Sequence, residues 1–309
     1  MSTVTVTVNR TMHRSRTISF IAPRLSSILN LPAELILAIV ELAISGKPAT
    51  LATTCKGISS VVEIILYRTV VLNNPKTIDL FYRTTLSRPR AFFAEHVKKL
   101  IVTWDLSERQ TSSISKIIAF CPAVWALVSP SCHLFSMAMQ APDYNGPSEV
   151  TFQAYEGGDT PDHLSPPFLK LSRTLTHLRF CQPSDSWYSP SFILSTFGPL
   201  PHLSHLQLSR HADANEDNDL TFVEDIRMIL RSKPALKIVV ISIFERCTWP
   251  MSRAEDSHIW NLMHSVKEDD PRIVIMNGNC DEWRYLEGCG QGASWNEWRP
   301  TDFWALAKG

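Results

Sequence analysis

Two stretches with the same spacing of apolar residues decide the fold expected for this chain: Leu175-Thr176-His177-Leu178-Arg179-Phe180 and Leu203-Ser204-His205-Leu206-Gln207-Leu208. The alternation of apolar and polar residues in each stretch predicts a strand with one buried face. Shorter versions of the pattern recur from residue 96 onward. Their central residues are 100, 127, 152, 178, 206, 239 and 276, which lie 27, 25, 26, 28, 33 and 37 residues apart. This period indicates an internal structural repeat.

Helical patterns fill several gaps between these strands. Three are expected to begin at a capping box, in which Ser or Thr is followed three residues later by Gln or Glu: Ser107/Gln110, Thr221/Glu224 and Ser252/Glu255. A shorter helix is expected from Ser189-Pro190 to Gly198. Strands alternating with helices over short connections predict an α/β fold with a parallel sheet and right-handed crossovers, either an irregular αβ solenoid or an open α/β sandwich.

The strand pattern resembles that of leucine-rich repeats, and the first four spacings fall in the range of about 20 to 29 residues typical of them. The resemblance implies a curved solenoid whose concave face carries the side chains that alternate with the inward leucines. These residues are Lys99, Ile101, Thr103, His177, Arg179, His205, Gln207, Ile238 and Val240. We expect them to bind a target protein. In the alternative interpretation, His177 and His205 are simply polar residues on an exposed sheet face.

The N-terminal region contains an unusually apolar helical segment, Leu31-Pro32-Ala33-Glu34-Leu35-Ile36-Leu37-Ala38-Ile39-Val40. Proline suits the first helical position, and Glu34 would face the positive end of the helix dipole. Apolar side chains surround nearly the whole helix, so we expect its own neighbours to cover one side and a partner protein to cover the other. Alternatively, the rest of the chain covers it entirely. Two further helices are expected at 49–56 and 58–68.

This order of residues resembles the F-box of fungal F-box-like proteins: the Leu-Pro-x-Glu-Leu opening at 31–35, then Ile39, Leu51, Thr54-Cys55-Lys56, and the stretch 66–72 as an exit strand. Gly57-Ile58 stands where the family usually has a tryptophan. The resemblance implies a non-catalytic substrate receptor of a cullin-RING (SCF-type) ubiquitin ligase. Its partners would be a Skp-type adaptor, the cullin scaffold and an unknown target protein. The residues implied to bind the adaptor are Leu31, Pro32, Leu35, Ile36, Ile39 and Val40. The alternative is an adaptor-independent interaction scaffold that retains the F-box fold.

Three domains follow from these patterns: a disordered basic tail at 1–27, the F-box-like module at 28–72, and the repeat domain at 73–309. Four tryptophans near the end, Trp283, Trp295, Trp298 and Trp304, are expected to cover the edge of the last repeat, or alternatively to anchor a bound peptide. We expect a cytoplasmic or nuclear protein. The acid-free, arginine-bearing tail leaves mitochondrial import as a minor alternative.

Several function classes lack their sequence signals. The chain has no GxSxG, HExxH or GxxxxGK[ST] motif, so we expect no enzyme activity and no cofactor. Seven scattered cysteines without a CxxC pair predict neither a metal site nor a disulfide framework. The acidic run Asp213, Glu216, Asp217 and Asp219 lacks the pattern of a calcium loop and is expected to be a solvated loop before a helix. No long apolar run or basic stripe indicates a membrane or nucleic acid as a partner.

Overall fold

The computed structural model describes residues 31–44, 53, 56–103, 108–132, 146–157, 173–245, 253–279, 283 and 303–304. The chain divides into two compact units, Met1–Glu63 and Ile64–Gly309, and the boundary falls within α3 (Lys56–Arg68). The first unit contains α1 (Ala33–Ile44) and the start of α3. The basic tail, nearly all of the expected helix at 49–56, Trp295 and Trp298 lie outside the described residues.

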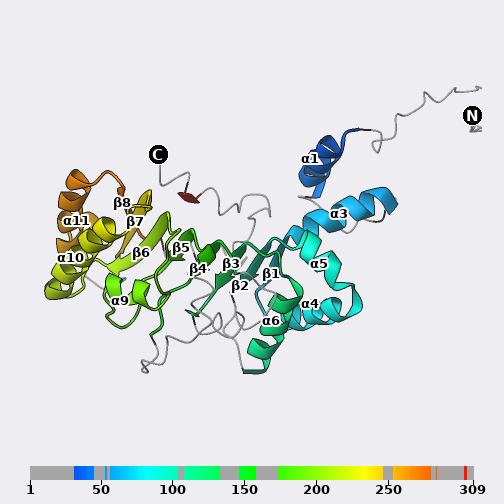
Figure 1. Ribbon diagram of the computed structural model, residues 1–309, viewed down its shortest axis with the longest axis horizontal. Coiled ribbons are helices and arrows are strands. Elements are labelled where there is room, and N and C mark those ends of the chain that lie inside the picture. The colour runs from blue at the N-terminus through cyan, green and yellow to red at the C-terminus, as the bar shows by residue number, and fades with distance from the viewer. Residues whose placement is uncertain are drawn as a thin grey trace, which may run out of the picture. The chain divides into compact units, whose positions relative to one another are not determined.

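The second unit is built on one parallel sheet of eight strands, which confirms the α/β class predicted from the sequence. The strands lie side by side in chain order (Figure 1). They are β1 (Thr69–Leu72), β2 (Lys99–Val102), β3 (Ala126–Ser129), β4 (Glu149–Phe152), β5 (His177–Phe180), β6 (His205–His211), β7 (Ile238–Phe244) and β8 (Ile273–Asn277). Of the stretch 66–72 expected as an exit strand, residues 69–72 form the first strand of the sheet, paired with β2, whereas residues 66–68 are the end of α3.

The register of the sheet places one apolar residue from every strand in a continuous row. The row consists of Val70, Leu100, Leu127, Val150, Leu178, Leu206, Val239 and Ile273, with spacings of 30, 27, 23, 28, 28, 33 and 34 residues. Two predicted centres were wrong, because Val150 occupies the place expected for residue 152 and Ile273 the place expected for Met276. Met276 lies an odd number of residues from Ile273 and therefore on the opposite face.

The helices explain why this row is buried. When the strands of a parallel sheet run in chain order, every right-handed crossover places its helix on the same face. That face is covered by α4 (Pro75–Ser87), α5 (Arg90–His96), α6 (Glu108–Phe120), α9 (Pro190–Ser195), α10 (Glu216–Ser232) and α11 (His258–Asp269), as Figure 1 shows. The row and the inner sides of these helices form the main hydrophobic core. None of these crossover helices therefore lies on the opposite face of the sheet.

The helix starts were only partly predicted. Ser189 caps α9 as expected. The expected cap Ser107 lies outside the described residues, and α6 is described from Glu108. The expected cap at Thr221 was wrong, because α10 begins at Glu216 after the cap residue Asn215, and acidic residues in its first turn favour that start. The expected cap at Ser252 was also wrong, because a 3-10 turn (Ala254–Asp256) intervenes and Ser257 caps α11.

Candidate interaction surfaces

Helix α1 presents two different apolar faces. Leu31, Leu35 and Ile39 are 39%, 52% and 40% exposed, whereas Ile36 and Val40 are only 8% and 2% exposed. Residues four apart lie nearly above one another on a helix, and neighbouring residues are about 100° apart, so 35 and 39 form one stripe and 36 and 40 another. The helix is therefore covered along one stripe and open to solvent along the adjacent one.

This division separates the residues expected to contact an adaptor into an exposed and a buried group. Leu31, Pro32, Leu35 and Ile39 are exposed, but the burial of Ile36 and Val40 removes them from a surface that a partner can reach without rearrangement. Pro32 also lies one position earlier than expected. Its carbonyl accepts hydrogen bonds from the backbone N–H groups of Leu35 and Ile36, so the helix starts at Ala33.

The face of the sheet opposite these helices, which we name the concave face after the expected solenoid, contains all of the residues expected to bind a target. Lys99, His177, His205 and Ile238 lie in one row of the register, and Ile101, Arg179, Gln207 and Val240 lie in the next. Thr103 follows β2 on the same face. The sequence therefore predicted correctly which side chains the sheet brings together.

The expectation that this face is open to solvent was wrong. Seven of the nine residues are buried: Lys99, Ile101, Thr103, Arg179, Gln207, Ile238 and Val240. His177 and His205 are half-buried. Because α4, α5, α6, α9, α10 and α11 all lie on the other face, the described cover comes from residues far along the chain.

Two C-terminal tryptophans provide much of that cover. Trp283 packs with Ile101, Val128 and Cys181, and Trp304 packs with Ile238 and Val240. Phe303 lies against the second cluster, which places the 303–304 segment (dark red in Figure 1) over the concave side of the sheet. Both tryptophans therefore lie on the concave face. Trp283 lies over β2 and β3, far from the expected edge of the last repeat, whereas Trp304 lies against side chains of the last two strands.

Trp304 contacts a pair of stacked histidines. The His177 and His205 rings lie 4.1 Å apart between centroids, and the Trp304 ring lies 5.6 Å and 5.1 Å from them. The hydroxyl of Thr176 donates a hydrogen bond to the Ser148 carbonyl, and it contacts His177 Nδ1 at 2.8 Å. Since the single hydroxyl proton is already used, we assign the proton of this contact to His177 Nδ1. Ser204 holds His205 in the same way, because its hydroxyl donates to the Thr176 carbonyl.

A polar network continues beside the histidines. Arg179 Nε donates to Gln207 Oε1 at 2.9 Å, and Gln207 Nε2 donates to Ser242 Oγ at 2.9 Å. The Arg179 guanidinium carbon lies 3.6 Å from the centre of the Phe303 ring, a cation–π contact. Phe303 and Trp304 therefore pack on a surface made of the stacked imidazoles, the hydrogen-bonded Arg179 guanidinium and the aliphatic side chains of Ile238 and Val240.

Two charged residues of the concave face, Lys99 on β2 and Glu149 on β4, are buried. Burial lowers the pKa of the Lys99 ammonium from 10.5 to about 7, although attraction to Glu149 opposes this and repulsion from Arg179 adds to it. Burial likewise raises the pKa of Glu149, against the attraction of Lys99 and Arg179. Ala126 lies between them in the register. Lys99, Glu149 and Arg179 thus form one electrostatically interacting group on this face of the sheet.

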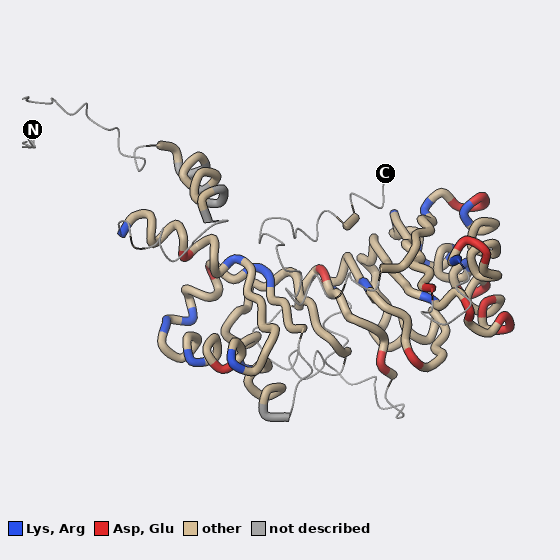
Figure 2. The backbone as a smooth tube through the Cα atoms, turned by 180° about the vertical axis from the view of Figure 1, so that it is seen from behind, with Lys and Arg blue, Asp and Glu red and all other residues tan. Residues whose placement is uncertain are grey.

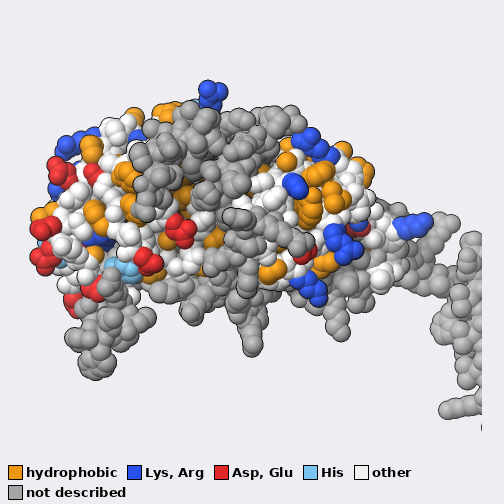
Figure 3. All heavy atoms as spheres, turned by 90° about the horizontal axis from the view of Figure 1, so that it is seen from below, with side chains coloured by type: hydrophobic (Ala, Val, Ile, Leu, Met, Phe, Trp, Pro, Cys, Tyr) orange, Lys and Arg blue, Asp and Glu red, His pale blue; other side chains and the backbone are white. Residues whose placement is uncertain are grey.

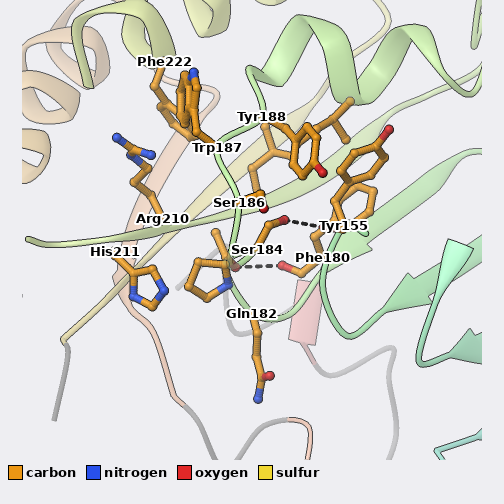
Figure 4. Close-up of a pocket in the computed structure, with 14 residues that line it drawn as sticks. Tyr155, Phe180, Gln182, Ser184, Ser186, Trp187, Tyr188, Arg210, His211 and Phe222 are labelled. Atoms are coloured by element: carbon orange, nitrogen blue, oxygen red, sulfur yellow. Dashed lines mark hydrogen bonds between the residues drawn. The ribbon is translucent and has the colours of Figure 1, made fainter. Parts of the chain in front are cut away.

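A small hollow lies at the carboxyl ends of the central strands, where parallel sheets commonly hold ligands. Its walls include Tyr155, Trp187, Tyr188 and Arg210, and Figure 4 shows Trp187 beside the Arg210 guanidinium. Its volume is about 40 Å³, room for about three water molecules. This is too small for a typical metabolite.

The acidic run was expected to be solvated, but one of its members is completely buried. Asp219 Oδ1 accepts hydrogen bonds from Arg210 Nε at 2.9 Å and Nη2 at 2.8 Å, and His258 Nδ1 lies 3.4 Å from Asp219 Oδ2. Burial raises the pKa of Asp219, while Arg210 and His258 lower it. Glu216 and Asp217 are exposed as expected, but together with Asp219 they lie in the first turn of α10 rather than in a loop before it.

The surface of the second unit carries basic, acidic and apolar residues. Figure 2 shows basic residues around α4 and α5 and acidic residues around α10 and α11. On the face shown in Figure 3, apolar side chains are interspersed with charged ones. The described residues bring no three His, Cys, Asp or Glu side chains together as a metal site would require. None of the described helices combines the length and apolar composition needed to cross a bilayer.

Comparison with known proteins leaves the family undecided. No family model matches the chain, and no curated protein matches it significantly.

Proposed function

We propose that this chain is a non-catalytic substrate receptor of a cullin-RING (SCF-type) ubiquitin ligase. An F-box-like helical module would bind a Skp-type adaptor, and a leucine-rich-repeat-like αβ solenoid would bind the target protein. Ubiquitin transfer would then reside in the partner proteins rather than in this chain.

The observation that carries the proposal is the division of α1 into a buried stripe and an exposed one. A helix that exposes Leu31, Leu35 and Ile39, each 39% or more accessible, presents a row of anchors suited to a hydrophobic groove. The row begins within the Leu31-Pro32 opening, the position that the F-box resemblance implies. Leu31, Pro32, Leu35 and Ile39 are the residues we assign to the adaptor contact.

The second unit supports the target-binding half of the proposal. Eight strands in chain order with helices on one face are typical of repeat solenoids, in which each unit contacts mainly its neighbours. Five of the seven spacings between successive inward residues are 30 or less, and the last two are 33 and 34, so the repeat is irregular. The concave face is the surface that such solenoids offer to a partner.

Co-expression with a Skp-type adaptor tests the proposal. The wild-type chain should co-purify with the adaptor, and Leu35→Asp combined with Ile39→Asp should abolish co-purification, because two carboxylates cannot enter an apolar groove unpaired. Leu86→Asp on α4 is the matched control, since Leu86 is 62% exposed and lies in the other unit. Circular dichroism of each variant establishes that it remains folded.

A folded wild-type chain that does not associate with the adaptor would overturn the adaptor half. Association that persists in the Leu35→Asp/Ile39→Asp variant would overturn the assignment of the contact to this stripe. In the first case, the chain would instead be an adaptor-independent interaction scaffold.

A further inference from the structure

The contact between Phe303-Trp304 and the concave face has the composition of a peptide in a receptor. Trp304 is only 6% exposed and contacts the imidazole pair, Ile238 and Val240, while Phe303 lies on the Arg179 guanidinium. Aromatic anchors held by aliphatic, aromatic and arginine side chains are the usual centre of a protein interface. Here the anchor belongs to the same chain as its receptor.

The residues that hold this anchor are separate from the core that holds the sheet. Ile238, Val240 and Trp304 form their own cluster, whereas Leu206 and Val239 point to the other face and belong to the main core. Removing the anchor would therefore uncover the part of the concave face around Ile238 and Val240 without opening the packing between sheet and helices. This separation makes the segment a detachable cover.

Trp304 also leaves one hydrogen-bond donor unpaired in its present position. The indole N–H of Trp304 is buried and has no hydrogen-bond acceptor among the described residues. Burying such a donor without an acceptor carries a desolvation penalty, which a ligand with a better-placed acceptor avoids. A competing segment can therefore displace Trp304 without matching every contact that it makes.

From these observations we infer that the concave face is a binding site for a peptide segment bearing an adjacent Phe-Trp pair, and that Phe303-Trp304 occupies this site in cis. The target segment takes the place of this pair: its tryptophan lies against His177 and His205, and its phenylalanine lies on Arg179. The cis segment then sets the minimum affinity that a target needs, because the target must displace Phe303-Trp304. The inference rests on the target-binding half of the proposed function and deepens it, and it is independent of the adaptor half.

Fluorescence anisotropy with a labelled synthetic peptide of residues 300–309 tests the inference on full-length proteins. The wild-type chain should bind the peptide weakly, because its own segment fills the site. A Phe303→Ala/Trp304→Ala chain should bind it at least tenfold more tightly. A peptide in which both aromatic residues are alanine should not bind either protein. Trp125→Ala, which changes a tryptophan that is 42% exposed, is the matched control and should behave as wild type.

A second variant keeps the test decisive if the double variant does not fold. Trp304→Phe retains a smaller aromatic cover and should give a peptide affinity severalfold above wild type. If folded Phe303→Ala/Trp304→Ala and Trp304→Phe proteins bind the peptide no better than wild type, Phe303-Trp304 is only a structural cover and the inference is overturned. Adaptor co-purification by the same proteins shows whether the adaptor half fails separately.

Discussion

The imidazole rings of His177 and His205 stack face to face on neighbouring strands, 4.1 Å apart and 13° from parallel. The stack follows from the repeat itself, because Thr176-His177-Leu178 and Ser204-His205-Leu206 occupy equivalent positions and each hydroxyl holds the ring that follows it. The pair gives Trp304 a flat surface in the middle of the concave face.

Removing half of this stack should weaken recognition of an aromatic anchor. In the Phe303→Ala/Trp304→Ala background, His205→Ala should lower the affinity for the labelled peptide about three- to tenfold, the value of one aromatic contact. His202→Ala changes an exposed histidine before the same strand and should have no effect. Equal affinities for the two histidine variants would show that the tryptophan of the peptide does not bind to the stacked imidazoles.

Lys99 should make stability rise with pH above neutrality. Its pKa in the folded protein is about 7, below its ordinary 10.5, so between these values the unfolded chain binds more protons than the folded one. Unfolding free energy should therefore increase by about 1 kcal/mol per pH unit between pH 7 and 8.5. Urea denaturation of Lys99→Met should lack this slope, while Lys98→Met should keep it. A slope that survives in Lys99→Met would exclude Lys99 as its source.

Removing only the aspartate of the ion pair between Arg210 and Asp219 should destabilise the protein more than removing both charges. Asp219 is 0% exposed, so Asp219→Ala leaves a guanidinium in a buried place and should destabilise the protein by about 3–5 kcal/mol. Arg210→Met with Asp219→Ala should cost less than Asp219→Ala alone. Asp217→Ala, in the same helical turn but exposed, is the control. A double variant that is the least stable of the three would contradict this account.

The two stripes of α1 should respond differently to truncation. Ile36→Ala should destabilise the helix by about 2–4 kcal/mol, because Ile36 is 8% exposed. Leu35→Ala, at a position that is 52% exposed, should change stability little and should weaken adaptor binding instead. Hydrogen exchange across α1 measures the first effect. Equal protection in both variants would show that the stripes are not distinct.

The strands were predictable because apolar alternation is a local property. Leu178 and Leu206 mark their strands in sequence, and pairing in chain order then fixes the sheet. Errors arose where local signals compete. Thr221 resembles a cap, but the acidic turn from Glu216 starts the helix earlier, and Met276 resembles an inward residue, although Ile273 is the one in register.

The interaction surfaces were less predictable because they depend on contacts distant in sequence. Nothing local to Arg179 indicates that Phe303 covers it, and nothing in the apolar sequence of α1 distinguishes Leu35 from Ile36. The start of α4 was not predicted, although the sequence carries a signal for it: Asn74 and Thr77 form a capping box, and Pro75 occupies the first helical position.

Affinity purification from the cells that make this protein tests its central role most directly. The wild-type chain should recover both a Skp-type adaptor and a cullin, and the Leu35→Asp/Ile39→Asp chain should recover neither. Absence of both partners from the wild-type sample, or equal recovery by the folded variant, would contradict the role of α1 in a ubiquitin ligase.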